Sequence, residues 1–120
     1  MYYFLQDHQD TSFKTDVSLL LRILCNMLIN ACEATEKKGR IKLWLEKREN
    51  ALTFSVWNAK MIEEDVQERI FTRNFSTKSE TGRGIGTFSM KLFGEKILGG
   101  KMQFSSNASD GTIFSLTLPI

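Results

Sequence analysis

The most apolar run in this chain of 120 residues is Val17-Ser-Leu-Leu-Leu-Arg-Ile-Leu-Cys-Asn-Met-Leu-Ile-Asn-Ala-Cys-Glu-Ala34. Its pattern predicts one long helix over residues 17–36. Asp16 or Thr15 can cap the first turn of this helix, and Gly39 can end it. Because apolar residues cover almost its whole circumference, we expect most of the helix to be buried.

A stripe of polar side chains interrupts this apolar helix, and its members are Arg22, Asn26, Asn30 and Glu33. At about 100° per residue they lie within about 80° of one another. Polar groups on a buried helix need partners, because an unpaired buried amide costs on the order of 1–3 kcal/mol. Two interpretations remain open: hydrogen bonds to neighbouring backbone, or the wall of a cavity. In a cavity, the amide and carboxylate oxygens would suit Mg²⁺.

The rest of the chain predicts two hairpins and two further helices. We expect strands at residues 40–48 and 52–57, a short helix at 63–71, a polar loop at 72–83, a long helix at 84–98, and closing strands at 101–106 and 112–118. Residues 1–14 are poorly patterned, as in a linker remnant or a short edge strand. This order favours an α/β two-layer sandwich, with helices on one face of a mostly antiparallel mixed sheet.

Composition excludes several classes of protein. The chain has 16 Lys and Arg against 14 Asp and Glu, a net charge of +2, so no nucleic-acid partner is indicated. No run approaches the roughly 20 apolar residues of a membrane span, and the N-terminus does not resemble a signal peptide. Cys25 and Cys32 are about 10 Å apart on a helix, too far for a disulfide, and we expect buried thiols in a reducing compartment. His8 is the only histidine, which disfavours Ser/His and Cys/His catalysis.

Two more motifs suggest a phosphate site. Thr81-Gly-Arg-Gly-Ile-Gly-Thr87 opens a predicted helix, where glycine backbone N–H groups can approach an anion. It matches neither the dinucleotide fingerprint nor the Walker A loop. Ile70-Phe-Thr-Arg-Asn-Phe-Ser-Thr-Lys78 precedes it and adds hydroxyls and cations. Taken alone, each motif also fits a plain turn or a solvated loop with Phe71 and Phe75 as core anchors.

Together, the three segments resemble the N, F and G2 boxes of the ATP-binding catalytic domain of sensor histidine kinases, in the GHKL ATPase superfamily. The N box is Leu24-Cys-Asn26-Met-Leu-Ile-Asn30-Ala-Cys-Glu33-Ala34, the F box runs from Ile70 to Lys78, and the G2 box is Gly82-Arg-Gly84-Ile-Gly86. Gly111-Thr-Ile-Phe114 is similar to the late Gly-Thr motif of that family. The resemblance covers residues 15–120 and implies the Bergerat-type sandwich.

The resemblance also implies a binding site for ATP and Mg²⁺. Asn30 would be the Mg²⁺ ligand and the catalytic residue, Lys78 and Arg83 would neutralise phosphates, and residues 72–81 would form a lid. The residues implied to bind ATP are Asn26, Asn30, Glu33, Asn58, Ile62, Phe71, Phe75, Ser76, Thr77, Lys78, Thr81, Gly82, Arg83, Gly84, Ile85, Gly86 and Thr112.

One motif departs from the family pattern. The G1 box usually begins with an Asp that accepts from the adenine amino group and continues with two glycines, whereas this chain has Val56-Trp-Asn58-Ala-Lys-Met-Ile62. Asn58 stands at the Asp position, Lys60 replaces the first glycine, and the segment looks one residue short. An Asn can still accept from adenine N6 and donate to N1. A subset of histidine kinases resembles this variant.

By resemblance, the domain would transfer the γ-phosphoryl of ATP to a histidine on a dimerisation and phosphotransfer hairpin. This chain lacks the hairpin, because His8 is not in a phosphoacceptor context. The implied partners are that hairpin and a response regulator. The implied location is cytoplasmic, which includes the cytoplasmic part of a membrane-bound sensor, and this domain itself would make no direct membrane contact.

Three alternatives to a histidine kinase stay open. The first is a serine-kinase anti-sigma factor of the same superfamily, and the second is a non-catalytic nucleotide-binding module. The third, a gyrase-like or chaperone-like ATPase, is disfavoured. Those enzymes have a general-base Glu where this chain has Asn26, which cannot accept a proton from water.

Overall fold

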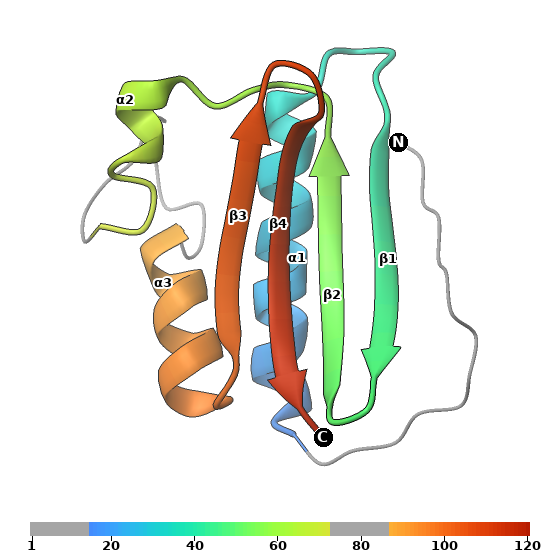
Figure 1. The fold of residues 1–120 in the computed structure, drawn as a ribbon, viewed down its shortest axis with the longest axis vertical. Coiled ribbons are helices and arrows are strands. Elements are labelled where there is room, and N and C mark those ends of the chain that lie inside the picture. Colours follow the sequence, from blue (N-terminus) through green and yellow to red (C-terminus); the bar gives the residue numbers. More distant parts are fainter. Residues whose placement is uncertain (1–14, 73–86) are drawn as a thin grey trace.

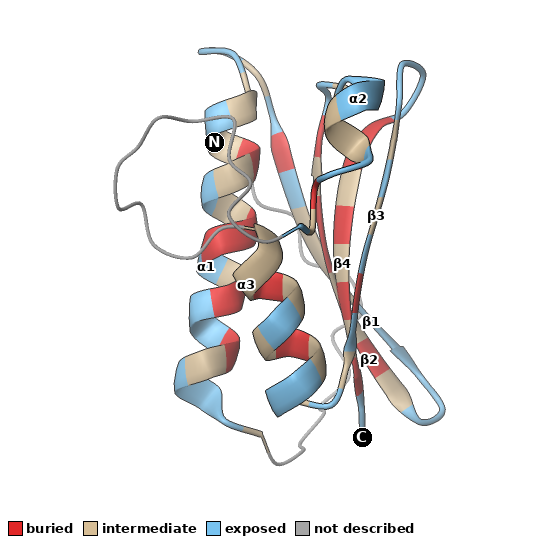
Figure 2. Cartoon of the chain, turned by 90° about the vertical axis from the view of Figure 1, so that its left-hand side faces the viewer, coloured by how far each residue is buried: buried red, intermediate tan, exposed pale blue. Residues whose placement is uncertain are grey.

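The fold was obtained as a computed structural model that describes residues 15–72 and 87–120. It has two layers, a four-stranded sheet with helices packed on one face (Figures 1 and 2). The strands are β1 (Ile41–Arg48), β2 (Ala51–Asn58), β3 (Lys101–Asn107) and β4 (Gly111–Pro119). Their order in the sheet is β1-β2-β4-β3, and every described pair is antiparallel. The expected α/β sandwich and both expected hairpins are confirmed.

The helical layer consists of α1 (Val17–Ala34) and α3 (Thr87–Leu92), which continues into the π-helical turn η1 (Phe93–Ile97), while the short α2 (Glu64–Gln67) lies near one end of the sheet (Figure 1). The turn η1 closes with a bond from the Leu98 N–H to the Phe93 carbonyl at 3.0 Å. The described part of the second long helix therefore includes a π-turn that its sequence pattern did not indicate.

Both ends of α1 are held by local hydrogen bonds. The Asp16 carboxylate accepts from the Leu19 N–H at 3.0 Å, which confirms Asp16 as the cap. At the other end, Thr35 has extended backbone angles and its N–H donates to the Cys32 carbonyl. The Thr35 hydroxyl also donates to the Ala31 carbonyl at 2.5 Å. These bonds end the helix before residue 36 and before Gly39, earlier than expected.

The apolar core lies between α1 and the sheet. Ile23 and Met27 on α1 are almost completely buried, as are Leu116 and Leu118 on β4. The opposite side of α1 is not covered by the described residues, so Val17 is 61% and Leu21 is 54% exposed. The expectation of a mostly buried helix was therefore wrong, because the sheet covers only one of its sides.

Two other expectations about α1 also need correction. Both cysteines are free, as predicted, but Cys25 is exposed and only Cys32 is partly buried. By length and composition alone α1 could cross a membrane, which the sequence reading had not recognised. In this fold, α1 packs against β2 and β1 as the core helix.

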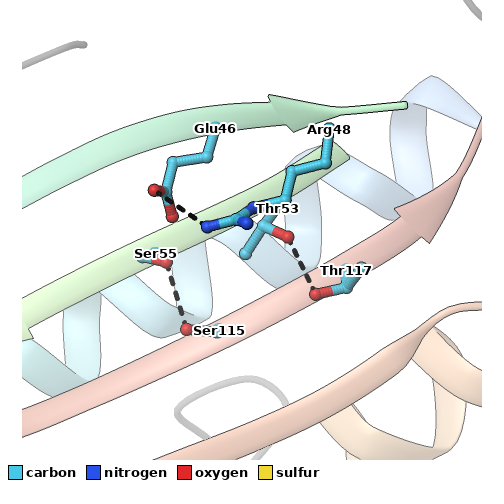
Figure 3. Close-up of polar contacts among 6 residues, drawn as sticks. All are labelled: Glu46, Arg48, Thr53, Ser55, Ser115 and Thr117. Carbon is cyan, nitrogen blue, oxygen red and sulfur yellow. Dashed lines mark hydrogen bonds and ion pairs between the residues drawn. The ribbon is translucent and has the colours of Figure 1, made fainter. Parts of the chain in front are cut away.

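The sheet face away from the helices carries short hydroxyl side chains. Hydroxyl pairs join β2 to β4 at Thr53–Thr117, with 3.0 Å between oxygens, and at Ser55–Ser115, with 3.1 Å (Figure 3). Glu46 and Arg48 form an exposed ion pair on β1, with 4.0 Å between nitrogen and oxygen (Figure 3). The two hydroxyl pairs stabilise the pairing of β2 with β4, whereas the ion pair lies within β1. Asn58 and Thr112, the strand residues predicted to bind a ligand, lie instead on the helix-facing side.

Candidate functional site

One cross-strand row brings polar residues together at an end of the sheet. Asn58 of β2 pairs with Thr112 of β4, which pairs with Ser106 of β3, and Ile41 of β1 completes the row. Side chains alternate along strands, so this row shares the face of the buried Val56 and Phe114, toward the helices. The row lies at the end of the sheet where α1 ends and the chain enters α2 (Figure 1).

Asn58 has the most informative side chain in this row. Asn58 is only 5% exposed. Its Nδ2 is the one buried side-chain nitrogen or oxygen, among the described residues, without a hydrogen-bond partner. Leaving such a donor unpaired costs on the order of 1–3 kcal/mol. A ligand that offers an acceptor here would recover that free energy, which fits the predicted contact with adenine N1.

The segment that follows Asn58 is fixed by hydroxyl groups of the same row. The Thr112 hydroxyl donates to the Lys60 carbonyl at 2.7 Å. The Ile62 N–H donates to Ser106 Oγ at 2.8 Å, and the Gln67 amide donates to the Ile62 carbonyl at 2.7 Å. Thr112, which was predicted from the sequence, thus binds the segment after Asn58, and the predicted Ile62 is part of that segment. Ser106 was missed, although strand alternation already placed it, a polar residue, on the inward face of β3.

The polar stripe of α1 divides between core and surface. Asn26 is 6% exposed and faces the core side, Asn30 is half-buried, and Arg22 and Glu33 are exposed. Asn26, Asn30 and Glu33 each have an interaction partner, so none of them is a free polar group. Asn30 and Glu33 belong to the C-terminal part of α1, which runs to the same end of the molecule as the Asn58 row (Figure 1).

Phe71 serves the packing of the domain. Its ring meets Phe104 and Phe114 edge-on, with centroids 5.5 and 6.2 Å apart. The Thr87 hydroxyl donates to the Ile70 carbonyl. This bond brings the residues on either side of segment 73–86 together. The core-anchor interpretation is confirmed for Phe71, and its contact with ATP stays a prediction.

Several predicted site residues fall outside the described part of the chain. The predicted lid at residues 72–81 also lies almost wholly outside it, as does segment 1–14. The site residues in this group are Phe75, Ser76, Thr77, Lys78, Thr81, Gly82, Arg83, Gly84, Ile85 and Gly86.

The described residues contain no cluster of three or more His, Cys, Asp or Glu side chains that could hold a metal ion. A protein cage of carboxylates is thus not formed in residues 15–72 and 87–120. Mg²⁺ does not need one, because it commonly takes one or two protein oxygens together with substrate phosphates and water. The half-buried Asn30 offers one such oxygen, so its chemistry fits the predicted role.

Comparison with known proteins defines the class. Residues 15–120 match the family described as histidine kinase-, DNA gyrase B- and HSP90-like ATPases, and the chain belongs to this family. Among solved structures, the catalytic domain of the histidine kinase ThkA superposes with a TM-score of 0.85 at 32% identity. That match covers 98% of this chain and 76% of the ThkA chain.

Curated relatives narrow the class to sensor kinases. A probable C4-dicarboxylate sensor kinase of Halalkalibacterium halodurans is 31% identical over 94% of this chain and 21% of its own length. The heme sensor protein HssS of Staphylococcus aureus is 30% identical over 96% of this chain and 25% of its own length. The chain thus spans about a quarter or less of these relatives. It corresponds to the ATP-binding catalytic domain of a sensor histidine kinase, as the resemblance implied.

Proposed function

We propose that this domain binds Mg²⁺-ATP and presents the γ-phosphoryl group to a histidine on a dimerisation and phosphotransfer hairpin outside this chain. The observation that carries the proposal is the buried, unpaired Nδ2 of Asn58 at the adenine-recognition position. A structural turn residue would have paired this donor within the protein, because buried amides are nearly always hydrogen-bonded.

We propose the following roles from the family resemblance, supported for the described residues by their places in the fold. Asn58 binds the Watson–Crick edge of adenine, and Ile62, which packs against the core, flanks the base. Asn30 holds Mg²⁺, with Asn26 and Glu33 on the same wall. The glycines of segment 82–86, with Lys78 and Arg83, bind the phosphates. Bound Mg²⁺ would offset phosphate charge, and the protein contributes positioning and electrostatic stabilisation rather than a covalent intermediate.

The partners of the whole protein follow from the same reaction. A solved complex contains ThkA with the response regulator TrrA, and this chain matches ThkA there at 28% identity with a TM-score of 0.79. We propose that a response regulator likewise takes the phosphoryl group from the hairpin histidine. The reaction uses ATP, and the free Cys25 and Cys32 suit a reducing compartment, so the domain would be cytoplasmic.

Two measurements test this proposal. Titration calorimetry should detect Mg²⁺-ATP binding to the isolated chain, and Asn58→Leu should weaken it. With γ-labelled ATP the chain alone should stay unlabelled, and an added cognate hairpin should gain an acid-labile, base-stable phosphate. Binding without transfer to that hairpin would favour the non-catalytic module, and transfer to a partner's serine would favour the anti-sigma kinase. An acid-labile phosphate on His8 would contradict the role of the separate hairpin.

A further inference from the structure

Three hydrogen bonds form a continuous relay beside Asn58. The Ile62 N–H lies 2.8 Å from Ser106 Oγ, Ser106 Oγ lies 2.7 Å from Thr112 Oγ1, and Thr112 Oγ1 lies 2.7 Å from the Lys60 carbonyl. The relay begins and ends on the same short segment, residues 60–62, which is neither helix nor strand. It passes through two strands of the sheet, so it ties the segment to a rigid support.

The direction of every bond in the relay is determined. A hydroxyl has one hydrogen to donate. The Thr112 hydrogen goes to the Lys60 carbonyl, which can only accept. Ser106 must therefore donate to Thr112, while its lone pair accepts from the Ile62 N–H. Thr112, only 2% exposed, has no hydrogen left for a ligand.

We infer that Ser106 is a positioning residue of the adenine site, an inference that rests on the proposed function. Its hydroxyl holds residues 60–62, the segment where the family's G1 box usually carries glycines, and it donates to Thr112 Oγ1 while the Thr112 hydrogen stays on the Lys60 carbonyl. The free donor in this row is then Asn58 Nδ2. A base with an acceptor at the contacted edge, as adenine has at N1, would pair with this donor.

The chain offers a matched pair of variants for this inference. Ser106→Ala removes the middle of the relay, so the Ile62 N–H loses its acceptor and Thr112 Oγ1 loses the hydrogen bond that it accepts. Ser105→Ala removes the neighbouring hydroxyl, which is exposed and alternates to the other face of β3. We expect Ser106→Ala to weaken ADP and ATP binding by about 5- to 10-fold, in line with one lost hydrogen bond, and Ser105→Ala to leave binding unchanged. Ser106→Thr keeps a hydroxyl and should restore most of the affinity.

The experiment combines calorimetry with ADP as probe, melting temperatures, and hydrogen exchange of the Ile62 amide. Faster Ile62 exchange and weaker ADP binding in Ser106→Ala, both recovered in Ser106→Thr, would support the inference. Equal ADP affinity in the Ser106→Ala and Ser105→Ala variants would overturn it and leave ATP binding by the wild type intact. A fall in melting temperature with no change in affinity would likewise reduce Ser106 to a packing residue. If the wild type binds no nucleotide, the proposed function itself fails.

Discussion

Gly111 should be among the least replaceable residues near the site, and Gly111→Ala tests the geometry there. Gly111 has a φ of +82°, which L side chains rarely adopt. A Cβ at this position would lie 2.9 Å from the Ala59 Cα and closer still to the Asn58 carbonyl oxygen. These are backbone atoms, so they cannot move aside by a rotamer change. The substitution would displace the chain at the residue that we expect to bind adenine.

The magnitude has two parts that the chain allows us to separate. Left-handed backbone geometry costs alanine about 1–2 kcal/mol. Displacing packed atoms costs about 1–3 kcal/mol more. Gly99 has a φ of +75° with nothing within 4 Å of a Cβ, so Gly99→Ala measures the first part alone. We therefore expect a loss of about 1–2 kcal/mol for Gly99→Ala and about 2–5 kcal/mol for Gly111→Ala.

Urea denaturation of the wild type and the two variants gives the free energies of unfolding, and calorimetry gives Mg²⁺-ATP affinity. Only Gly111→Ala should weaken nucleotide binding, because only its Cβ meets the Asn58–Ala59 backbone. Equal destabilisation by the two substitutions, or unchanged ATP affinity in a folded Gly111→Ala, would refute the reasoning.

Three further predictions follow from the site and the helical layer. Asn30→Ala should abolish productive Mg²⁺-ATP binding at an unchanged melting temperature, because it removes a proposed Mg²⁺ ligand. Wild-type affinity of this variant in calorimetry would contradict the proposed role of Asn30 as a metal ligand. Asn58→Asp should widen the preference for ATP over GTP, because a carboxylate cannot donate to guanine O6. Asn58→Leu should weaken ATP binding by about 1–3 kcal/mol in competition assays. If both variants leave the ATP affinity and the ATP/GTP ratio unchanged, Asn58 is a turn residue. The pKa of Glu95 lies below its usual 4.5, mainly because its carboxylate accepts a hydrogen bond from the Met102 N–H. The nearby Lys91 lowers this pKa further. The charged form is thus favoured in the folded state, and its stabilisation is present above pH 4.5 and lost as pH falls through the lowered pKa. Glu95→Gln should cost about 0.5–1 kcal/mol at pH 7, and urea titrations of the variant and wild type should converge at low pH; a difference that persists there would contradict a charge effect.

The sequence by itself indicated the order of the helices and strands and, by resemblance, the residues of the candidate site. The first helix from residue 17, its Asp16 cap and both hairpins follow from periodicity and turn chemistry, which act between residues near one another in the chain, although the helix ends at Ala34, before the predicted residue 36. The N, F and G2 motifs identified the family. Asn58 was recognisable as a candidate adenine contact because it stands in the place of the usual Asp, next to a predicted strand.

Only the tertiary structure decided which of these residues meet. The pairing of β2 with β4 joins Asn58 to Thr112, and no local pattern specifies a contact between positions so far apart in the chain. Exposure of Val17 and Cys25 depends on what packs against α1, so an apolar sequence alone could not predict it. The same applies to Ser106. Its hydroxyl gains a role only because long-range strand pairing places it between the Ile62 N–H and Thr112.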